Sequence, residues 1–229
     1  MNIVILGATS AIAQETARCF AAEGASFFLV ARDAAKCAIV ADDLRARGAA
    51  AAETFIADLA DFSFHAAIAA AAPQSIDIVL IAHGSLPDQR AIDDDPAAQV
   101  ASFELNATSF ISLAAHFADR TKTLALIGSV AGDRGRATNY VYGAAKAALH
   151  TYCEGLRARG VNVVLIKPGW IDTPMTSHMR KNPLFASAPI AGRLIHDAIV
   201  ANRPVVYVPR FWRWISLIVR MLPARLVRF

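Results

Sequence analysis

The sequence has few cysteines and no recognisable export pattern. Its three cysteines, Cys19, Cys37 and Cys153, have no paired spacing, so we expect small buried side chains rather than disulfides or metal ligands. No basic segment precedes the first apolar run, Asn2–Leu6, which already has the pattern of a strand. The sequence therefore indicates no signal peptide, and a cytoplasmic location is the default expectation.

Charged residues are scarce, at 18% of the chain, whereas 55% of the residues are hydrophobic. This composition favours a large packed core over disorder, and 229 residues fit one α/β domain. Most histidines are scattered without the spacing of metal ligands, so we predict no metal site. These histidines are His65, His116, His150, His178 and His196.

Acidic residues are absent from the last part of the chain. Six of the 23 basic residues follow residue 198, where no Asp or Glu occurs. The rest of the chain therefore has 17 basic and 19 acidic residues. The positive charge is therefore local to the tail, which argues against nucleic-acid binding and for an anionic partner of the C-terminus. The six residues are Arg203, Arg210, Arg213, Arg220, Arg225 and Arg228.

Short apolar runs alternate with longer alanine-rich segments. The runs predict strands, and several, rich in consecutive Val, Ile and Leu, are expected to be buried on both faces; the runs are Asn2–Leu6, Ser26–Ala31, Ala51–Ile56, Asp77–Ala82, Thr123–Gly128, Val161–Lys167 and Pro204–Val208. The segments between them predict helices; they are Ala11–Glu23, Asp33–Arg47, Asp61–Ala71, Pro96–Ala118 and Tyr142–Arg159. Gly24, Gly48 and Gly160 stand where three helices should end.

This alternation predicts an α/β fold: a doubly wound parallel sheet of the Rossmann type, with about seven strands and helices on both faces. Residues 1–209 would form a single dinucleotide-binding and catalytic domain. Residues 210–229 would form a basic tail with an amphipathic helix.

A loop of small residues, Gly7–Ala13, follows the first strand and opens the first helix. Backbone N–H groups at such a helix N-terminus can bind a pyrophosphate. A plain tight turn would explain Gly7 equally well. Ala11 and Ala13 stand where two further glycines are expected, and their methyl groups would approach the pyrophosphate.

Arg32 follows the second strand, where enzymes that prefer NAD usually carry a carboxylate. A guanidinium there can pair with a 2′-phosphate, so we favour NADP over NAD. The alternative is a solvated Arg32, with Asp33 capping the next helix. Asp58, after the third strand, would either accept a bond from the adenine amine or stabilise a turn.

Tyr142 and Lys146 are four positions apart in a predicted helix, so both side chains share one face. A nearby ammonium would lower the pKa of the phenol and suit it to acid–base chemistry. Ser129 follows the preceding strand and could polarise a carbonyl oxygen. The alternative is a surface Lys beside a packed Tyr. Tyr140, six residues from Lys146, would face elsewhere.

These residues occur in the order typical of the short-chain dehydrogenase/reductase family, which the sequence resembles over nearly its whole length. The resemblance implies that Tyr142 is the general acid/base and that Lys146 lowers its pKa and binds the nicotinamide ribose. Ser129 would hold the substrate oxygen, and Asn106 would support a water-linked proton relay. The implied cofactor-binding residues are Gly7, Thr9, Ser10, Ala11, Ile12, Arg32, Asp58, Leu59, Ala82, Gly84, Tyr142, Lys146, Pro168, Gly169, Ile171 and Thr173.

The segment after the fourth predicted strand departs from the family pattern. The usual Asn-Asn-Ala-Gly reads Ile81-Ala82-His83-Gly84. His83 would then either lie near the ribose or simply pack.

The region of Pro174–Pro189 is expected to form a mobile substrate lid. It combines apolar and basic side chains, which suit a lipid, a sugar or a phosphate, and a solvated loop is the alternative. The residues concerned are Met175, Met179, Arg180, Lys181, Leu184 and Phe185.

The segment 211–223 contains two tryptophans, apolar residues and spaced arginines. It is too short and too charged to span a membrane, but it suits a helix lying in an anionic interface. Packing on the body or on another subunit is the alternative. A homo-oligomer is compatible with the sequence.

Residues 130–136, the lid and the tail together resemble a narrower branch, that of decaprenylphosphoryl-2-keto-β-D-erythro-pentose reductase, which reduces a keto-sugar on a polyprenyl phosphate. The sequence thus predicts an NADPH-dependent reductase of a lipid-linked or otherwise hydrophobic carbonyl. Acyl or steroid-like ketones are alternative substrates. A non-catalytic NADP-binding scaffold at the membrane is the alternative of another class.

Overall fold

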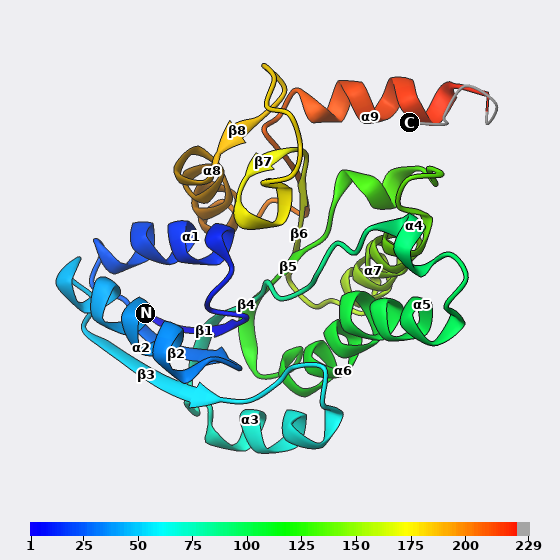
Figure 1. The fold of residues 1–229 in the computed structure, drawn as a ribbon. Helices are drawn as coiled ribbons and strands as arrows, with labels where there is room; N and C mark the ends of the chain where they lie inside the picture. Colours follow the sequence, from blue (N-terminus) through cyan, green and yellow to red (C-terminus); the bar gives the residue numbers. More distant parts are fainter. Residues whose placement is uncertain (224–229) are drawn as a thin grey trace.

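The computed structural model describes residues 1–223, so Arg225 and Arg228 of the predicted tail lie outside the described residues. Its main sheet has seven parallel strands in the order β3-β2-β1-β4-β5-β6-β9 (Figure 1). Because the strand order reverses between β1 and β4, a crevice opens there at the carboxyl ends of the strands. The strands are β1 Asn2–Leu6, β2 Ser26–Ala31, β3 Ala51–Ile56, β4 Ile76–Ile81, β5 Thr121–Ile127, β6 Val163–Pro168 and β9 Val205–Val208.

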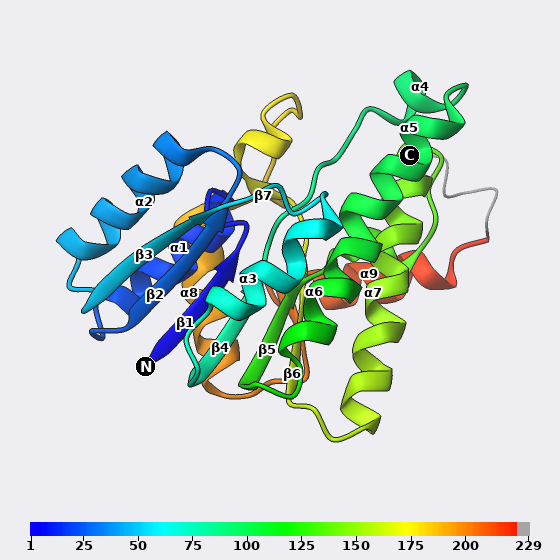
Figure 2. The ribbon, with the colours of Figure 1, turned by 90° about the horizontal axis from the view of Figure 1, so that it is seen from below.

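Helices cover both faces of this sheet, as the views in Figures 1 and 2 show. One core lies under α1 Ala11–Ala21, α2 Ala34–Ala46 and α8 Ala188–Val200, and the other under α3 His65–Ala71, α6 Ser109–Phe117 and α7 Tyr140–Ala158. Successive residues of β1 alternate between the two cores, with Ile3 and Ile5 in the first and Val4 and Leu6 in the second. The predicted doubly wound sheet is confirmed.

Several element boundaries differ from the prediction. The long helix expected over Pro96–Ala118 consists of α5 Pro96–Phe103, a π-helical turn Glu104–Thr108 and α6. The lid expected over Pro174–Pro189 is shorter, because Pro189 lies in the first turn of α8, where proline is tolerated. The helix predicted over Asp61–Ala71 consists of the short η1 Phe62–Phe64 followed by α3. The elements without a sequence prediction are α8, α4 Gln89–Ile92, the small parallel pair β7 Ile171–Asp172 and β8 Ala186–Ser187, and the short helices η3 Val130–Asp133 and η4 Pro174–Thr176.

The last described helix is α9 Trp212–Met221, which lies along the top of Figure 1. Its inner face packs on η3 and β9 and buries Trp212, Ser216 and Val219. The indole of Trp212 occupies the space beside Gly169 and donates a hydrogen bond to the Leu184 carbonyl oxygen, with 3.3 Å between nitrogen and oxygen. The helix is therefore part of the body on one side.

The opposite face of α9 is apolar and exposed. We call it the outer stripe: Trp214, Leu217, Ile218 and Met221. Helices in the described part of the chain are all too short or too polar to cross a bilayer.

Candidate active site

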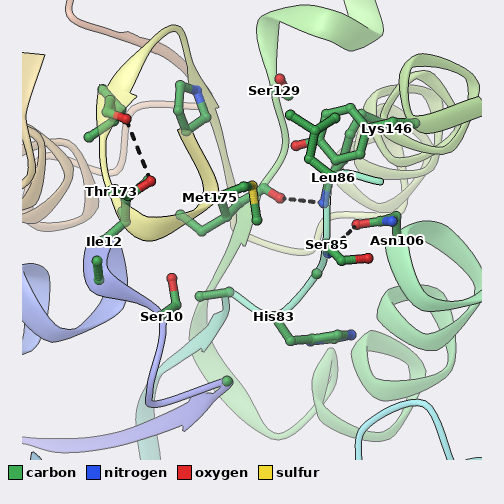
Figure 3. Close-up of a pocket in the computed structure, with 18 of the residues that line it drawn as sticks. Ser10, Ile12, His83, Ser85, Leu86, Asn106, Ser129, Lys146, Thr173 and Met175 are labelled. Atoms are coloured by element: carbon green, nitrogen blue, oxygen red, sulfur yellow. Dashed lines mark hydrogen bonds between the residues drawn. The ribbon is translucent and has the colours of Figure 1, made fainter. Parts of the chain in front are cut away.

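One cavity of about 640 Å³ lies at the carboxyl ends of the strands, across the reversal of strand order. Figure 3 shows Ser10 and Ile12 on one side of it and Asn106 and Lys146 on the other. Every site residue that the sequence predicted lines this cavity. They are Gly7, Thr9, Ser10, Ala11, Ile12, Arg32, Asp58, Leu59, Ala82, Gly84, Asn106, Ser129, Tyr142, Lys146, Pro168, Gly169, Ile171 and Thr173.

The turn after β1 approaches the end of β4 more closely than any side chain would allow. Gly7 has a φ of 95°, and a Cβ built on it would lie 2.6 Å from the backbone nitrogen of His83. Glycine is required there for both reasons. The close approach brings the start of α1 to the edge of the cavity, where Ala11 and Ile12 line it.

The two alanines of this loop differ in position. Ala13 is fully buried in the core between α1 and the sheet, whereas Ala11 lines the cavity. Only one of the two extra methyl groups, that of Ala11, therefore faces the space that a pyrophosphate would occupy. The methyl group of Ala13, contrary to the expectation from the sequence, does not approach it.

Arg32 is exposed at the end of β2 and lines the cavity, and within residues 1–223 it forms no ion pair. Its neighbour Asp33 caps α2, accepting a hydrogen bond from the Lys36 N–H at 3.0 Å. Asp58 accepts one from the Ala60 N–H at 3.0 Å. The cap and the turn suggested by the sequence are thus both present, and Arg32 remains facing the cavity.

Ser129, Tyr142 and Lys146 meet at the other end of the cavity. Ser129 caps η3, and its Oγ accepts a hydrogen bond from the Ala131 N–H at 3.1 Å, which leaves its own proton to donate. Tyr142 and Lys146 project from one face of α7. The buried Lys146 Nζ donates to the Ile127 carbonyl oxygen at 3.2 Å.

The pKa of Tyr142 differs from the sequence-based expectation. Burial raises it to about 12, and the group that lowers it is Ser129, through a side-chain hydrogen bond. Lys146 is not among the groups that shift the pKa of Tyr142 here, and burial lowers the pKa of Lys146 itself to about 7. Near neutral pH the phenol is therefore protonated, while Lys146 is divided between its two forms.

Asn106 is fully buried in the π-helical turn. Its Oδ1 accepts a hydrogen bond from the Ser85 N–H at 3.1 Å, and its Nδ2 donates to the Ser102 carbonyl oxygen at 2.9 Å. A Cβ built on Gly84 would lie 2.6 Å from Asn106 Oδ1 and 3.8 Å from Lys146 Nζ. Asn106 and Lys146 thus both approach Gly84, in the neighbourhood that a proton relay would need.

His83 packs rather than presenting a charged group. Its Nε2 lies 2.7 Å from the Ser109 hydroxyl, and its ring stacks on Phe110 at 4.1 Å between centroids. Burial lowers the pKa of His83 well below its usual value, so the ring is neutral. Its backbone, against Gly7, is what shapes the cavity.

The catalytic end of the cavity has further wall residues that sequence reasoning missed: Leu86, Arg136, Asn139, Trp170, Met175, Thr176 and Met179. Of these, Met175 and Met179 were assigned to the lid, but not to a site. Arg136 and Asn139 lie between two predicted catalytic residues, and Trp170 follows Gly169, so proximity in sequence was the available signal.

The basic residues of the lid are not directed to a substrate phosphate as the sequence suggested. Lys181 pairs with Asp172 at 2.7 Å and lies over the Phe185 ring at 4.6 Å. Arg180 does not line the cavity. The cations that do line it are Arg32, Arg136 and Lys146, and Asp58 is the one carboxylate among its described lining residues.

Comparison with known proteins agrees with this geometry. Residues 1–184 match the family model described as short chain dehydrogenase. An uncharacterized oxidoreductase of Mycobacterium tuberculosis is 35% identical over 233 residues, covering 96% of this chain and 93% of that protein. Galactitol 2-dehydrogenase (L-tagatose-forming) of Cereibacter sphaeroides is 33% identical over 192 residues, covering 78% of this chain and 74% of the relative.

Solved structures share the fold. A short-chain dehydrogenase from Sphingobium yanoikuyae in complex with NADPH aligns with a TM-score of 0.82 at 24% identity, covering 97% of this chain and 96% of that one. A second structure, of a short chain dehydrogenase/reductase family protein, aligns with a TM-score of 0.80 at 27% identity, covering 90% and 94%.

Proposed function

The chain belongs to the short-chain dehydrogenase/reductase family and is an oxidoreductase of CH–OH and C=O groups; from this premise we propose that it is an NADPH-dependent reductase of a keto-sugar carried on a lipid. The observation that carries this proposal is the protonated phenol of Tyr142 beside Ser129 at the end of the cavity, which places a proton donor there. A carbonyl that is reduced needs a proton donor at its oxygen.

NADPH fits the residues present. Because Gly7 has no side chain, the turn after β1 packs against the His83 backbone, which leaves the start of α1 open to the cavity that runs from there to Tyr142. Arg32, at the end of β2 without a carboxylate in the cofactor-facing position, is suited to a 2′-phosphate. The NADPH complex of the Sphingobium relative supports the same choice. When bound, the nicotinamide supplies the hydride.

The side chains of the chain itself provide the proton chemistry. Tyr142 donates its proton to the carbonyl oxygen. When the carbonyl is bound, the Ser129 hydroxyl donates to that oxygen instead of to the phenol, so that negative charge developing there is stabilised. The pKa of Lys146 is about 7, so at neutral pH its ammonium form can return a proton to the phenolate. Asn106 would then hold a water that links Lys146 to solvent.

The composition of the catalytic end supports a substrate with both an apolar and an anionic part. Leu86, Trp170, Met175 and Met179 provide apolar wall, and Arg136 adds positive charge. The named reaction of the Cereibacter relative, on a polyol and a keto-sugar, supports a sugar at the reacting carbonyl. A polyprenyl phosphate carrier would supply the apolar and anionic parts together.

The outer stripe of α9 supports delivery of such a substrate at a membrane surface. Its four exposed apolar residues face away from the body, and Arg210, Arg213 and Arg220 are exposed nearby. Apolar burial in the interface combined with attraction to anionic headgroups is how such helices bind bilayers.

The test is NADPH oxidation with a series of carbonyl substrates, from free keto-sugars to keto-sugars on prenyl phosphates. Tyr142→Phe should reduce kcat by about 10²- to 10⁴-fold while NADPH still binds, as followed by its fluorescence. Tyr140→Phe is the matched control, because that hydroxyl is exposed and bonds to Asp93 at 2.9 Å. Retained turnover in Tyr142→Phe would refute the assigned acid, and NADPH binding without turnover of any carbonyl would favour a scaffold.

A further inference from the structure

A buried carboxylate lies directly behind the wall that carries Ser129. Asp133 is the last residue of η3, and its side chain is 4% exposed. The residues of η3 that line the cavity are Val130 and Ala131, so Asp133 faces the interior of the protein. An ionised group in such a place requires partners that compensate the loss of water.

Three side chains surround this carboxylate. Lys167 Nζ donates to Oδ1 at 2.7 Å, and the Tyr207 hydroxyl donates to Oδ2 at 2.8 Å. His150 Nδ1 lies 3.5 Å from Oδ1. One carboxylate therefore joins elements that are far apart in the sequence.

Two of the three partners, Lys167 and His150, belong to segments that carry part of the site. Lys167 directly precedes Pro168 and Gly169, which line the cavity. His150 is one helical turn beyond Lys146 on α7. Tyr207 lies opposite Lys167 in the pairing of β6 with β9. Through Asp133, the loop of Ser129 is tied to the helix of Tyr142 and to the proposed nicotinamide wall.

The tie is reinforced by close packing between η3 and α7. A Cβ built on Gly132 would lie 2.6 Å from His150 Cε1 and 2.7 Å from the backbone nitrogen of Ala147. No space is left for η3 to shift towards α7. A displacement of η3 would therefore alter the position of Ser129 relative to Tyr142.

The negative charge of Asp133 is compensated mainly by its direct ion pair with Lys167. Arg136, which lines the cavity, adds a longer-range electrostatic attraction to the same carboxylate. His150 is neutral near pH 7, because burial and the charge of Lys167 lower its pKa to about 4. Removing the carboxylate alone would leave the Lys167 ammonium buried without its partner.

We propose that Asp133 is a positioning residue, which sets the place of Ser129 relative to Tyr142 and to the wall formed by Pro168 and Gly169. The inference rests on the proposed reductase function for its consequence in turnover. Its structural part, the anchoring of η3, can be measured without turnover.

The experiment compares Asp133→Asn with the double variant Asp133→Asn/Lys167→Met, which removes both charges and so protects the fold. The control is Asp77→Asn, which breaks an aspartate–lysine pair of the same 2.7 Å length, with Lys122, far from the cavity at the start of the strands. Two quantities are measured: steady-state kinetics as a function of pH, and hydrogen exchange of the Ala131 and Gly132 amides.

We expect both Asp133 variants to lose about 10- to 100-fold in kcat, with an NADPH Kd close to that of the wild type and with faster exchange at Ala131 and Gly132. The double variant should recover the thermal stability but not the kcat. Because the Ser129 hydrogen bond lowers the pKa of Tyr142, its loss should make the phenol a weaker acid, so that kcat falls across the whole neutral pH range.

Unchanged kcat, pH profile and amide exchange in the folded double variant would overturn the positioning role. A wild-type chain that reduces no carbonyl would instead overturn the proposed function. In that case the amide exchange alone decides whether Asp133 anchors η3.

Discussion

Lys146 Nζ lies 5.7 Å from the centroid of the Tyr142 ring, and 4.2 Å from that of Phe110. The ammonium thus lies over aromatic faces, which partly stabilise its charge, but burial dominates and lowers its pKa to about 7. The residue that the proposed chemistry needs is held at a cost to the stability of the fold, and this cost can be measured.

Lys146→Met should therefore inactivate the enzyme and stabilise it. The unfolded chain binds a proton at Lys146 below about pH 10.5 that the folded chain takes up only near pH 7, so wild-type stability rises with pH across this window. The variant lacks this dependence. Without nucleotide we expect it to be more stable by about 2–4 kcal/mol near pH 7, allowing for the lost bond to Ile127, and by less than about 1 kcal/mol near pH 10.

Urea unfolding at the two pH values checks this. Lys122→Met, which replaces an exposed lysine, serves as the control and should show no such gain. A stability difference that is constant across the pH range would contradict the low pKa of Lys146.

Arg32→Asp should change the cofactor preference. It removes the guanidinium proposed to bind the 2′-phosphate and supplies a carboxylate that can accept bonds from ribose hydroxyls. We expect the NADPH Kd to rise by about 10- to 100-fold and the NADH Kd to fall. Fluorescence titration with both nucleotides measures the change, and Arg193→Asp, an exposed position outside the cavity lining, controls for net charge. If Arg32→Asp weakened the binding of NADPH and NADH equally, Arg32 would not be the residue that binds the 2′-phosphate.

Two glycine substitutions separate backbone strain from close approach. Gly7 and Gly24 both have positive φ, 95° and 76°, but nothing lies within 4 Å of a Cβ built on Gly24. Gly24→Ala should cost about 1–2 kcal/mol in the free energy of unfolding. Gly7→Ala must also displace the His83 backbone, so we expect a cost larger by at least about 2 kcal/mol, together with weakened NADPH binding. Similar losses in the two variants, measured by urea unfolding, would show that the loop relaxes freely.

The outer stripe of α9 can be tested without disturbing the inner face. Ile218→Ser/Met221→Ser replaces side chains that are 61% and 78% exposed, so the fold should be unaffected. We expect flotation with vesicles containing phosphatidylglycerol to fall by about tenfold or more, since each apolar side chain contributes about 1.5–3 kcal/mol when buried. High salt should weaken the binding of the wild type by screening its arginines.

The matched control is Ile39→Ser/Val100→Ser, at positions 68% and 57% exposed on other helices. It should float with the wild type. Equal flotation of the two double variants, or binding to pure phosphatidylcholine alone, would count against an anionic interface at α9.

Much of the fold was predictable because buried parallel strands leave a simple pattern. β1, β2 and β3 begin and end at the predicted residues. β1 and β2 are nearly continuous apolar runs, whereas β3, at the edge of the sheet, is largely exposed. The π-helical turn at Glu104–Thr108 was not predictable, because one extra residue in a helical turn barely changes the apolar period. Pro189 was assigned to the lid loop, but it lies in the first turn of α8, where proline is also common.

The location of the site could be predicted from the residues at the strand ends, whereas the pKa values of its side chains could not. Arg32, Asp58 and Ser129 follow strands, and parallel strands bring such residues to one edge of the sheet. The pKa of Tyr142 depends on burial by segments distant in sequence, which no local spacing encodes. The anchoring of Asp133 likewise joins four elements that only the tertiary fold brings together.

The contact between Trp212 and Gly169 has a consequence for how this protein can vary. The indole fills the volume that any side chain at residue 169 would need, so the last helix completes the back of the cavity wall. A larger residue at 169 would have to arise together with a smaller one at 212. Removing the chain beyond Arg210 would remove Trp212 and expose Gly169 from behind. The proposed membrane-binding helix is therefore also a structural part of the site, and its loss should affect the cavity.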